Sequence, residues 1–420
     1  MTLERAQLFT NRRDVAVFVS LCLFIMSLSL LQRYETFRHL TQFDDALMDV
    51  TVLKQYVKHK KDRTYYILKL RSDYGTFYTS ASQHLRNLVG RTLRLRVWVS
   101  RYSFYDQLTG GYLPSKILKV YPRLNAKTAL AHAIASQHQH PMIGELYGAL
   151  FTAFPMSQPL QEKLSTLGIS HLLAISGFHL GLISALLYYL LRPLYRMLQE
   201  RYFPYRSAHR DLFVLVFVLI STYLYFLGIL PSLLRAYTML LIGFILFDRG
   251  IKVLSMQTLF LTVMLLLAFM PELLFSLGFW LSVTGVFYIF VYLIYFQHAK
   301  THYNLIGVSV WVYLMMLPVS LYIFENFSLY HPFSVVASIL FLPFYTLSSV
   351  LHVFSHGAVF DAYLLHYLHL GSHASTLILP LYVIVIHLFL SLLALRYRYA
   401  AIALLPWSLF VFVGAVHHIA

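Results

Sequence analysis

The sequence is poor in cysteine and in charge. It contains one cysteine in 420 residues, Cys22, and 12% of its residues are charged. A single cysteine excludes a disulfide framework and a cysteine-based zinc site. Soluble globular proteins carry about 25% charged residues. These shortages exclude a soluble enzyme, a disordered chain and a fibrous repeat.

A nucleotide-binding motif is also missing. No glycine-rich loop ending in Gly-Lys-Ser or Gly-Lys-Thr occurs, and such a loop is what cradles the phosphates of ATP in P-loop proteins. The chain therefore has no visible energy source of its own, and we expect no cofactor.

Apolar residues are abundant instead. They make up 59% of the chain, and the mean hydropathy is +0.65. Ten apolar runs approach the ~20 residues needed to cross a bilayer, which predicts a polytopic α-helical membrane protein. The runs cover residues 15–31, 172–191, 212–230, 232–247, 253–270, 273–296, 305–324, 332–353, 376–395 and 400–416. Several are short, so some are expected to be re-entrant or broken, and 332–353 with Pro343 is the best candidate.

The positions of basic residues predict the orientation. The short segment 192–211 carries five arginines and should lie in the cytoplasm. The run 15–31 lacks a small-residue cleavage site after it, so we interpret it as an uncleaved first helix with a cytoplasmic N-terminus. Arg396 and Arg398 fit the same rule only if 332–353 does not cross.

Residues 32–127 differ from the rest because they hold more than half of the 33 basic residues. Their period-two pattern predicts strands at 48–57, 63–71, 74–81, 91–99 and 112–121, with a short helix at 82–89. Five strands with a helix before the fourth is the order of an OB-fold. We expect a small OB-like β-barrel on the extracytoplasmic side.

This predicted barrel interleaves basic and aromatic side chains, as OB-folds do where they bind single-stranded nucleic acid. The candidate DNA-binding residues are Lys69, Arg71, Arg94, Arg96, Trp98 and Arg101. Arg94, Arg96 and Trp98 alternate with leucines and valines, so they should face away from the core. The alternative is that the aromatic residues form the core, while the arginines are solvated or contact anionic lipid.

Polar residues cluster at the start of the apolar run 172–191. The string Gly-Ile-Ser-His-Leu-Leu-Ala-Ile-Ser-Gly-Phe-His-Leu-Gly at 168–181 includes His171, Ser176, Gly177, His179 and Gly181. Polar groups at this depth need partners or a cavity, and the two glycines permit close helix packing. One alternative is a helix start in the headgroup zone. Another is an intramembrane serine hydrolase with Ser176 as nucleophile, although Ala174 stands where a strained Gly-x-Ser turn needs glycine.

Two further features carry candidate roles. Arg235 lies near the start of an apolar helix, where an arginine either faces a cavity or reaches back to the interface. The histidine pairs His298/His302, His352/His356 and His369/His373 have the i, i+4 spacing of a metal site. They lie mostly outside the apolar runs and near few carboxylates, so we expect no metal.

The string at 171–179 closely resembles the signature of the ComEC family of competence DNA channels. Pro-Ser-Leu-Leu-Arg-Ala at 231–236 and Ser-Leu-Gly-Phe-Trp-Leu-Ser at 276–282 resemble two further family elements in the same order, with Trp280 where glutamine is usual. The resemblance covers roughly residues 142–395. His331 stands where relatives often have asparagine. No His-x-His-x-Asp-His string is present, so the chain resembles the short form without a metallo-β-lactamase-like domain.

The resemblance implies a non-enzymatic channel that conducts single-stranded DNA from periplasm to cytoplasm across the bacterial inner membrane during natural transformation. Expected partners are membrane lipid, a periplasmic DNA receptor, a type IV-like pilus and cytoplasmic strand-binding or motor proteins, with an oligomer possible. The expected divisions are 1–31, a tail and first helix; 32–126, the OB-like domain; 127–400, the channel domain; and 401–420, a terminal helix. The rival functions are a secondary transporter for a small anion or metal ion, and the hydrolase.

Overall fold

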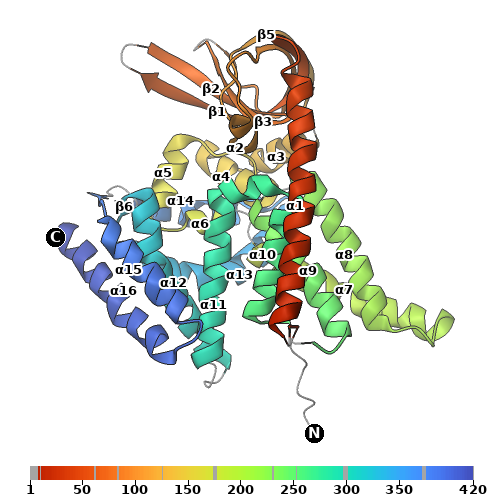
Figure 1. Ribbon diagram of the computed structural model, residues 1–420, viewed down its shortest axis with the longest axis vertical. Helices are drawn as coiled ribbons and strands as arrows, with labels where there is room; N and C mark the ends of the chain where they lie inside the picture. The colour runs from red at the N-terminus through yellow and green to blue at the C-terminus, as the bar shows by residue number, and fades with distance from the viewer. Residues whose placement is uncertain are drawn as a thin grey trace.

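The computed structural model describes residues 8, 9, 11–60, 63–82, 85–124, 126–173, 177–228, 231–251, 253–296, 301–370 and 375–419. A β-sheet stands at one end of a helical bundle, and a layer of short helices lies between them (Figure 1). One long helix, α1 (Arg12–Leu40), runs along the bundle and reaches the sheet.

Helix α1 joins the two parts without a break. Leu40 at its end packs in the core of the sheet domain. Lower down, Ser29 donates to Ala268 O of α10 (Met256–Phe269) at 2.8 Å, and Arg33 pairs with Glu272 at 2.9 Å. The expected division after residue 31 therefore falls inside a continuous helix.

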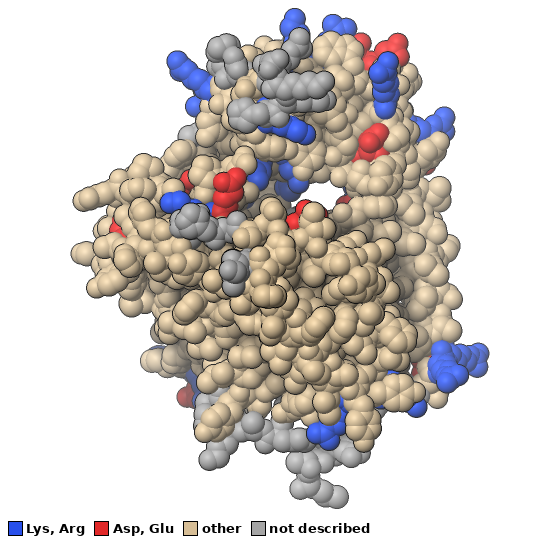
Figure 2. Space-filling view, turned by 90° about the vertical axis from the view of Figure 1, so that its left-hand side faces the viewer, with Lys and Arg blue, Asp and Glu red and all other residues tan. Residues whose placement is uncertain are grey.

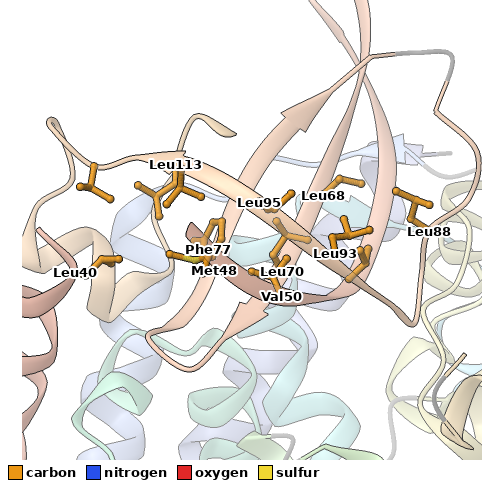
Figure 3. Close-up of a cluster of buried hydrophobic side chains, with 13 residues drawn as sticks. Leu40, Met48, Val50, Leu68, Leu70, Phe77, Leu88, Leu93, Leu95 and Leu113 are labelled. Atoms are coloured by element: carbon orange, nitrogen blue, oxygen red, sulfur yellow. The ribbon is translucent and has the colours of Figure 1, made fainter. Parts of the chain in front are cut away.

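The sheet is antiparallel, with the strand order β3-β2-β1-β4-β5. Its strands are β1 (Asp45–Lys60), β2 (Arg63–Ser72), β3 (Gly75–Ala81), β4 (Arg91–Trp98) and β5 (Ser115–Leu124). All five predicted strands are present. Alternation places Leu68, Leu70, Leu93 and Leu95 in a dry core with no exposed surface (Figure 3).

Two details of the sheet domain differ from the OB-like prediction. The helix predicted at 82–89 is wrong, because its described residues are irregular and Gln55 holds this segment by bonding Leu88 N and Arg86 O. A short helix, α2 (Phe104–Thr109), instead follows β4 and begins with a Ser103–Asp106 capping box.

The second difference is that the ladder is an open sheet. Its edge strand β3 approaches the chain before β5 at one place, where Tyr78 N bonds Gly111 O at 2.9 Å and Leu113 N bonds Tyr78 O at 2.8 Å. These bonds draw the two edges of the sheet together, and the strand ladder itself does not close into a barrel in the described residues.

Four short helices form the middle layer, namely α3 (Ala126–Ala135), α4 (Pro141–Thr152), α5 (Gln158–Thr166) and α6 (Ser170–Leu173). Apolar residues of α3 to α6 form one core cluster with Phe341, Tyr345 and Leu368. This layer supports the sheet domain.

The bundle follows the middle layer. It contains α7 (Gly177–Tyr202), α8 (Ala208–Leu227), α9 (Pro231–Asp248), α10, η1 (Pro271–Phe275), α11 (Leu277–Phe296), α12 (Thr301–Phe324), β6 (Asn326–Phe327), α13 (Phe333–Val353), η2 (Gly357–Phe360), α14 (Asp361–Leu370), β7 (Ser375–Thr376), α15 (Leu381–Leu393) and α16 (Arg398–Ile419).

Fewer helices can span a membrane than predicted. Within the described residues, six helices are long and apolar enough to cross, namely α1, α8, α11, α12, α13 and α16, while α10 and α15 are shorter apolar helices. The estimate of about ten is too high because some apolar runs form helices shorter than a span or continue into charged sequence. Helix α7, for example, runs on through Arg192 and Arg201.

Helix α13 contacts the middle layer at both ends. Before its start, His331 Nε2 bonds Ser165 O of α5 at 3.0 Å. At its last turn, His352 meets His138, which follows α3. The connection between α15 and α16 lies at the far end of the bundle from the sheet, as do the N-terminus and the connection between α7 and α8 (Figure 1).

Candidate nucleic-acid interface

The outer face of β4 presents the predicted basic residues. Arg94, Arg96 and Trp98 are exposed, whereas the residues that alternate with them, Leu93, Leu95 and Val97, are fully buried. In register beside them on β5 lie Lys119 and Lys116, also exposed. Arg101 is exposed in the turn after β4. This face is basic and carries one exposed indole, as predicted.

Strand β1 places carboxylates against the two arginines. Arg96 Nε lies 2.7 Å from Asp45 Oδ2, and Arg94 Nε lies 3.7 Å from Asp49 Oδ1. The hydrogen bond from Arg96 lowers the pKa of Asp45. Exposed pairs of this kind contribute little to stability, so the arginines can exchange a carboxylate for a phosphate. The face is nevertheless less positive than the sequence of β4 alone predicts.

A second group of basic residues lies where the sheet meets the helices. Lys54 contacts Gln161 Oε1 of α5 at 3.4 Å, and Lys69 lies over the Tyr78 ring at 5.5 Å. Arg71 donates to Gly228 O at 3.0 Å, and Lys127 donates to Leu227 O at 2.8 Å. We call Lys54, Lys69, Arg71 and Lys127 the junction cluster.

The cations of the junction cluster repel one another. Burial, and then the charge of Arg71, lower the pKa of Lys127 to about 8. Burial, and then the charge of Lys69, lower the pKa of Lys54. In the parts of the chain that the structure describes, none of the four forms an ion pair with a carboxylate. The cluster is therefore an uncompensated positive site.

Space-filling shows an opening between the sheet part and the helical part, with Lys and Arg atoms on one wall and acidic atoms at its lower rim (Figure 2). The junction cluster also lies between the sheet part and the helical part, because its members contact β2, β3, α5 and the end of α8.

Arg71 and Lys127 also have a structural role. Their acceptors are the last carbonyls of α8, where Gly228 ends the helix in the left-handed region with φ of 90°. Cations at a helix C-terminus interact favourably with the helix dipole. The two side chains therefore dock the sheet domain on the bundle, and each keeps further N–H donors for another ligand.

Deeper in the bundle, Arg235 brings together the three strings that carry the family resemblance. Its side chain is buried, and its Nε donates to Ser282 Oγ of α11 at 2.9 Å. Its guanidinium also lies against Gly177 at the start of α7, where an added Cβ would meet Arg235 Nη2 at 3.1 Å. Arg235 thus does not reach back to the interface; it joins α7, α9 and α11 from inside.

The two glycines of the string behave differently. A Cβ on Gly177 would lie 2.8 Å from Ala236 Cβ, so α7 and α9 approach closely there. Gly181 has open space beside it, with nothing within 4 Å. The close helix approach predicted for the pair is confirmed at Gly177 and does not occur at Gly181.

The two histidines of the string both contact α13. His171 Nε2 is 3.3 Å from Ser338 Oγ of α13. His179 is buried against the rings of Phe341 and Tyr345, with centroids 4.9 and 5.1 Å away. Ser176 lies outside the described residues. The string therefore packs α6 and α7 against α13.

Lys54 and Lys127 were not among the residues singled out from the sequence. Lys127 is the second residue of α3, where the chain returns from the sheet to the helices, and this position is the one signal that the sequence offers. Among the described residues, no group of three histidine, cysteine or acidic side chains has the arrangement of a metal site.

Together, the apolar helices and the basic sheet define a helical membrane protein with an N-terminal antiparallel sheet domain. Residues 152–419 match the family model described as Competence protein. The match covers more than half of the chain, and the chain belongs to the Competence protein family.

One relative is ComE operon protein 3 of Bacillus subtilis (strain 168). It is 35% identical over 183 residues, which is 43% of this chain and 22% of the relative. The matched part thus spans about a fifth of the relative's length. No solved structure matches this chain.

Proposed function

We propose that this protein conducts a single DNA strand across the bacterial inner membrane during natural transformation, from the side of the sheet domain to the side of the N-terminus. The observation that carries the proposal is the junction cluster, an uncompensated positive site between the sheet domain and the helices of a Competence protein family member. Phosphate is the one group common to every DNA sequence, and the cations of the junction cluster would bind it without reading bases.

The sheet domain supplies the first contacts in this proposal. It acts as an OB-like platform in the periplasm, with Trp98 and Tyr78 as stacking surfaces beside Arg96 and Lys69. Each stacked base contributes about 1–3 kcal/mol. The junction cluster then passes the strand to the helices, and Arg235 holds three of those helices in register.

No covalent chemistry enters the proposal, so the protein acts as a channel and not as an enzyme. The energy for movement comes from outside the chain, through cytoplasmic strand-binding or motor proteins. A periplasmic receptor and a type IV-like pilus deliver the DNA. These partners follow from the family resemblance and from the need to bring a large polyanion to the opening.

The proposal is tested by deleting the gene in its naturally transformable host and complementing with variants. We expect deletion to abolish transformants while fluorescent DNA still accumulates in the periplasm. Replacing both Lys69 and Lys127 by glutamine should lower transformation at least tenfold at unchanged protein level, because each lost phosphate contact weakens binding of every DNA sequence.

The matched control is Lys116→Gln with Lys119→Gln, which removes the same charge from the outer face of β5. A smaller loss is expected there. Equal losses in the two double variants would mean that net charge matters and the junction cluster does not. Normal transformation in the deletion strain would overturn the channel proposal and favour a transporter.

A further inference from the structure

A chain of hydrogen-bonding groups connects three segments on the sheet side of the bundle. Asp361 Oδ1 lies 2.9 Å from His138 Nδ1, and His138 Nε2 lies 3.1 Å from His352 Nε2. His352 Nδ1 in turn lies 2.7 Å from Ser348 O. His138 follows α3, His352 ends α13, and Asp361 begins α14.

This row of three contacts needs one more hydrogen than its side chains normally carry. The chain has three contacts, and each needs one hydrogen between its two heavy atoms. An ionised aspartate and two neutral imidazoles hold only two such hydrogens in total. The count is the same for every tautomer, because a hydrogen moved to one contact is taken from another. The arrangement therefore contains one proton more than these groups carry when aspartate is ionised and histidine is neutral.

We propose that Asp361, His138 and His352 form a proton-binding site that fastens the α3–α4 connection to α13 and α14. One proton taken from water changes the summed charge of the three groups from −1 to zero and completes the third contact. Without this proton, one of the three contacts has no hydrogen. Two acceptor atoms, for example the lone pairs of the two imidazoles, then face each other, and that contact opens. This inference does not depend on the proposed function.

The surroundings favour such a site. The His138 side chain has no exposed surface, while Asp361 keeps 15% of its side chain exposed and links the site to solvent. The Tyr147 ring of α4 stacks on His138 at 4.6 Å and 7°. Burial raises the pKa of Tyr147 to about 12, so the phenol stays neutral.

The other contacts of the site are uncharged. Gln137 donates to His352 O at 3.2 Å and accepts from Gly357 N at 3.2 Å, and Phe151 meets the His352 ring edge to face. In the described residues, no lysine or arginine is hydrogen-bonded to Asp361, His138 or His352. Asp361 and Tyr147 are thus the ionisable groups that face the imidazole pair from neighbouring elements.

The location gives the proton a mechanical consequence. Helix α13 also holds Phe341 and Tyr345, which pack on His179 of α7. The α3–α4 connection follows α3, the helix that carries Lys127 at its start. Opening the site on loss of the proton weakens the attachment of the last turn of α13 to the layer that carries the sheet domain, while the contact between His331 and Ser165 remains.

The test measures the melting temperature of the full-length protein in lipid nanodiscs between about pH 5.5 and pH 8.5. The folded wild type binds the extra proton more strongly than the unfolded chain, so its melting temperature should fall as pH rises. Asp361→Asn should remove that part of the fall and melt above wild type at the alkaline end. Its amide donates to His138 Nδ1, so three neutral groups then supply all three hydrogens.

His352→Gln is the second variant, because its amide can donate to His138 Nε2 and also removes the need for the extra proton. The control is His356→Gln, one turn further on and exposed, which should keep the wild-type pH dependence. An Asp361→Asn variant that melts below wild type by the same amount at every pH would show a hydrogen bond between an ionised aspartate and a neutral imidazole, with no extra proton, and overturn the proposal. So would a melting temperature that falls with a chelator, since a bound metal ion would then replace the proton.

Discussion

Lys127 shows how one side chain can serve both the fold and the site. Its ammonium caps the end of α8 through Leu227 O, and it lies close enough to Arg71 for the two charges to repel. Partial burial and that repulsion bring its pKa to about 8. Lys127 is therefore charged at neutral pH and loses its charge within a range that experiments can reach.

This property predicts the pH dependence of DNA binding. A lysine is charged below its pKa, so wild-type affinity for single-stranded DNA should fall between pH 7 and pH 9 as Lys127 loses its proton. Lys127→Arg should hold its affinity over this range, because arginine stays protonated. Fluorescence anisotropy with a labelled oligonucleotide measures both. An identical fall in the two proteins would show that Lys127 does not contact DNA.

At the scale of residues, the sequence predicts which way a side chain faces better than it predicts which residue that side chain contacts. Alternation along β4 correctly predicts that Arg94, Arg96 and Trp98 face outward, because side chains alternate sides in a strand. The pairing of Arg96 with Asp45 depends on the register between β1 and β4, 51 residues apart. The site of Asp361, His138 and His352 is likewise formed by tertiary packing and has no local signature.

At the scale of elements, the crossing of α7 and α9 depends on one glycine. Gly177 lets Ala236 and Arg235 come within contact distance, whereas Gly181, one turn later, faces open space. The small-residue spacing in the sequence does not distinguish the two, because that requires knowing on which side α9 lies.

Alanine substitutions test this difference. Gly177→Ala should destabilise the protein by about 1–3 kcal/mol, because the added methyl overlaps Ala236. Gly181→Ala should be neutral or stabilising by up to about 1 kcal/mol, since alanine favours helix and has room there. Thermal unfolding in nanodiscs measures both. Equal effects would mean that α7 and α9 do not meet at Gly177.

The sequence predicts secondary structure best where apolar residues recur with a strong period. All five strands were found, because alternating apolar residues mark a half-buried strand. The helix expected at 82–89 was wrong, since Gln55 of β1 bonds this segment and Leu88 enters the core. The number of spanning helices was overestimated, because apolar composition does not reveal where a helix breaks.

At the scale of the whole molecule, α13 decides the topology of the last third of the chain. Both of its ends contact the middle layer, through Ser165 and His138. The chain therefore leaves α13 on the side of the sheet. Helices α15 and α16 then run away from the sheet and back, so Arg396 and Arg398 lie with the other basic connections at the far end.

Cysteine labelling tests this topology. Cys22 is buried, with 2% of its surface exposed. Labelling of an introduced cysteine is therefore measured against a low background from the native one. Tyr105→Cys on the sheet side should react with a membrane-impermeant maleimide once the outer envelope is permeabilised. Tyr399→Cys should react only after the inner membrane is opened. Labelling of both under the first condition would mean that α13 crosses the membrane.

In the proposed function, the length of α1 has a consequence for how DNA would reach the protein. Its 29 residues extend about 43 Å at 1.5 Å per residue, whereas the hydrocarbon core is about 30 Å thick and each headgroup layer adds roughly 5–8 Å. With the apolar run 15–31 in the hydrocarbon, the turns from Arg33 to Leu40 extend about 11 Å beyond it, which is enough to carry the sheet past the lipid phosphates. A polyanion arriving from the water can then meet the cations of the sheet before it meets the negative surface of the bilayer.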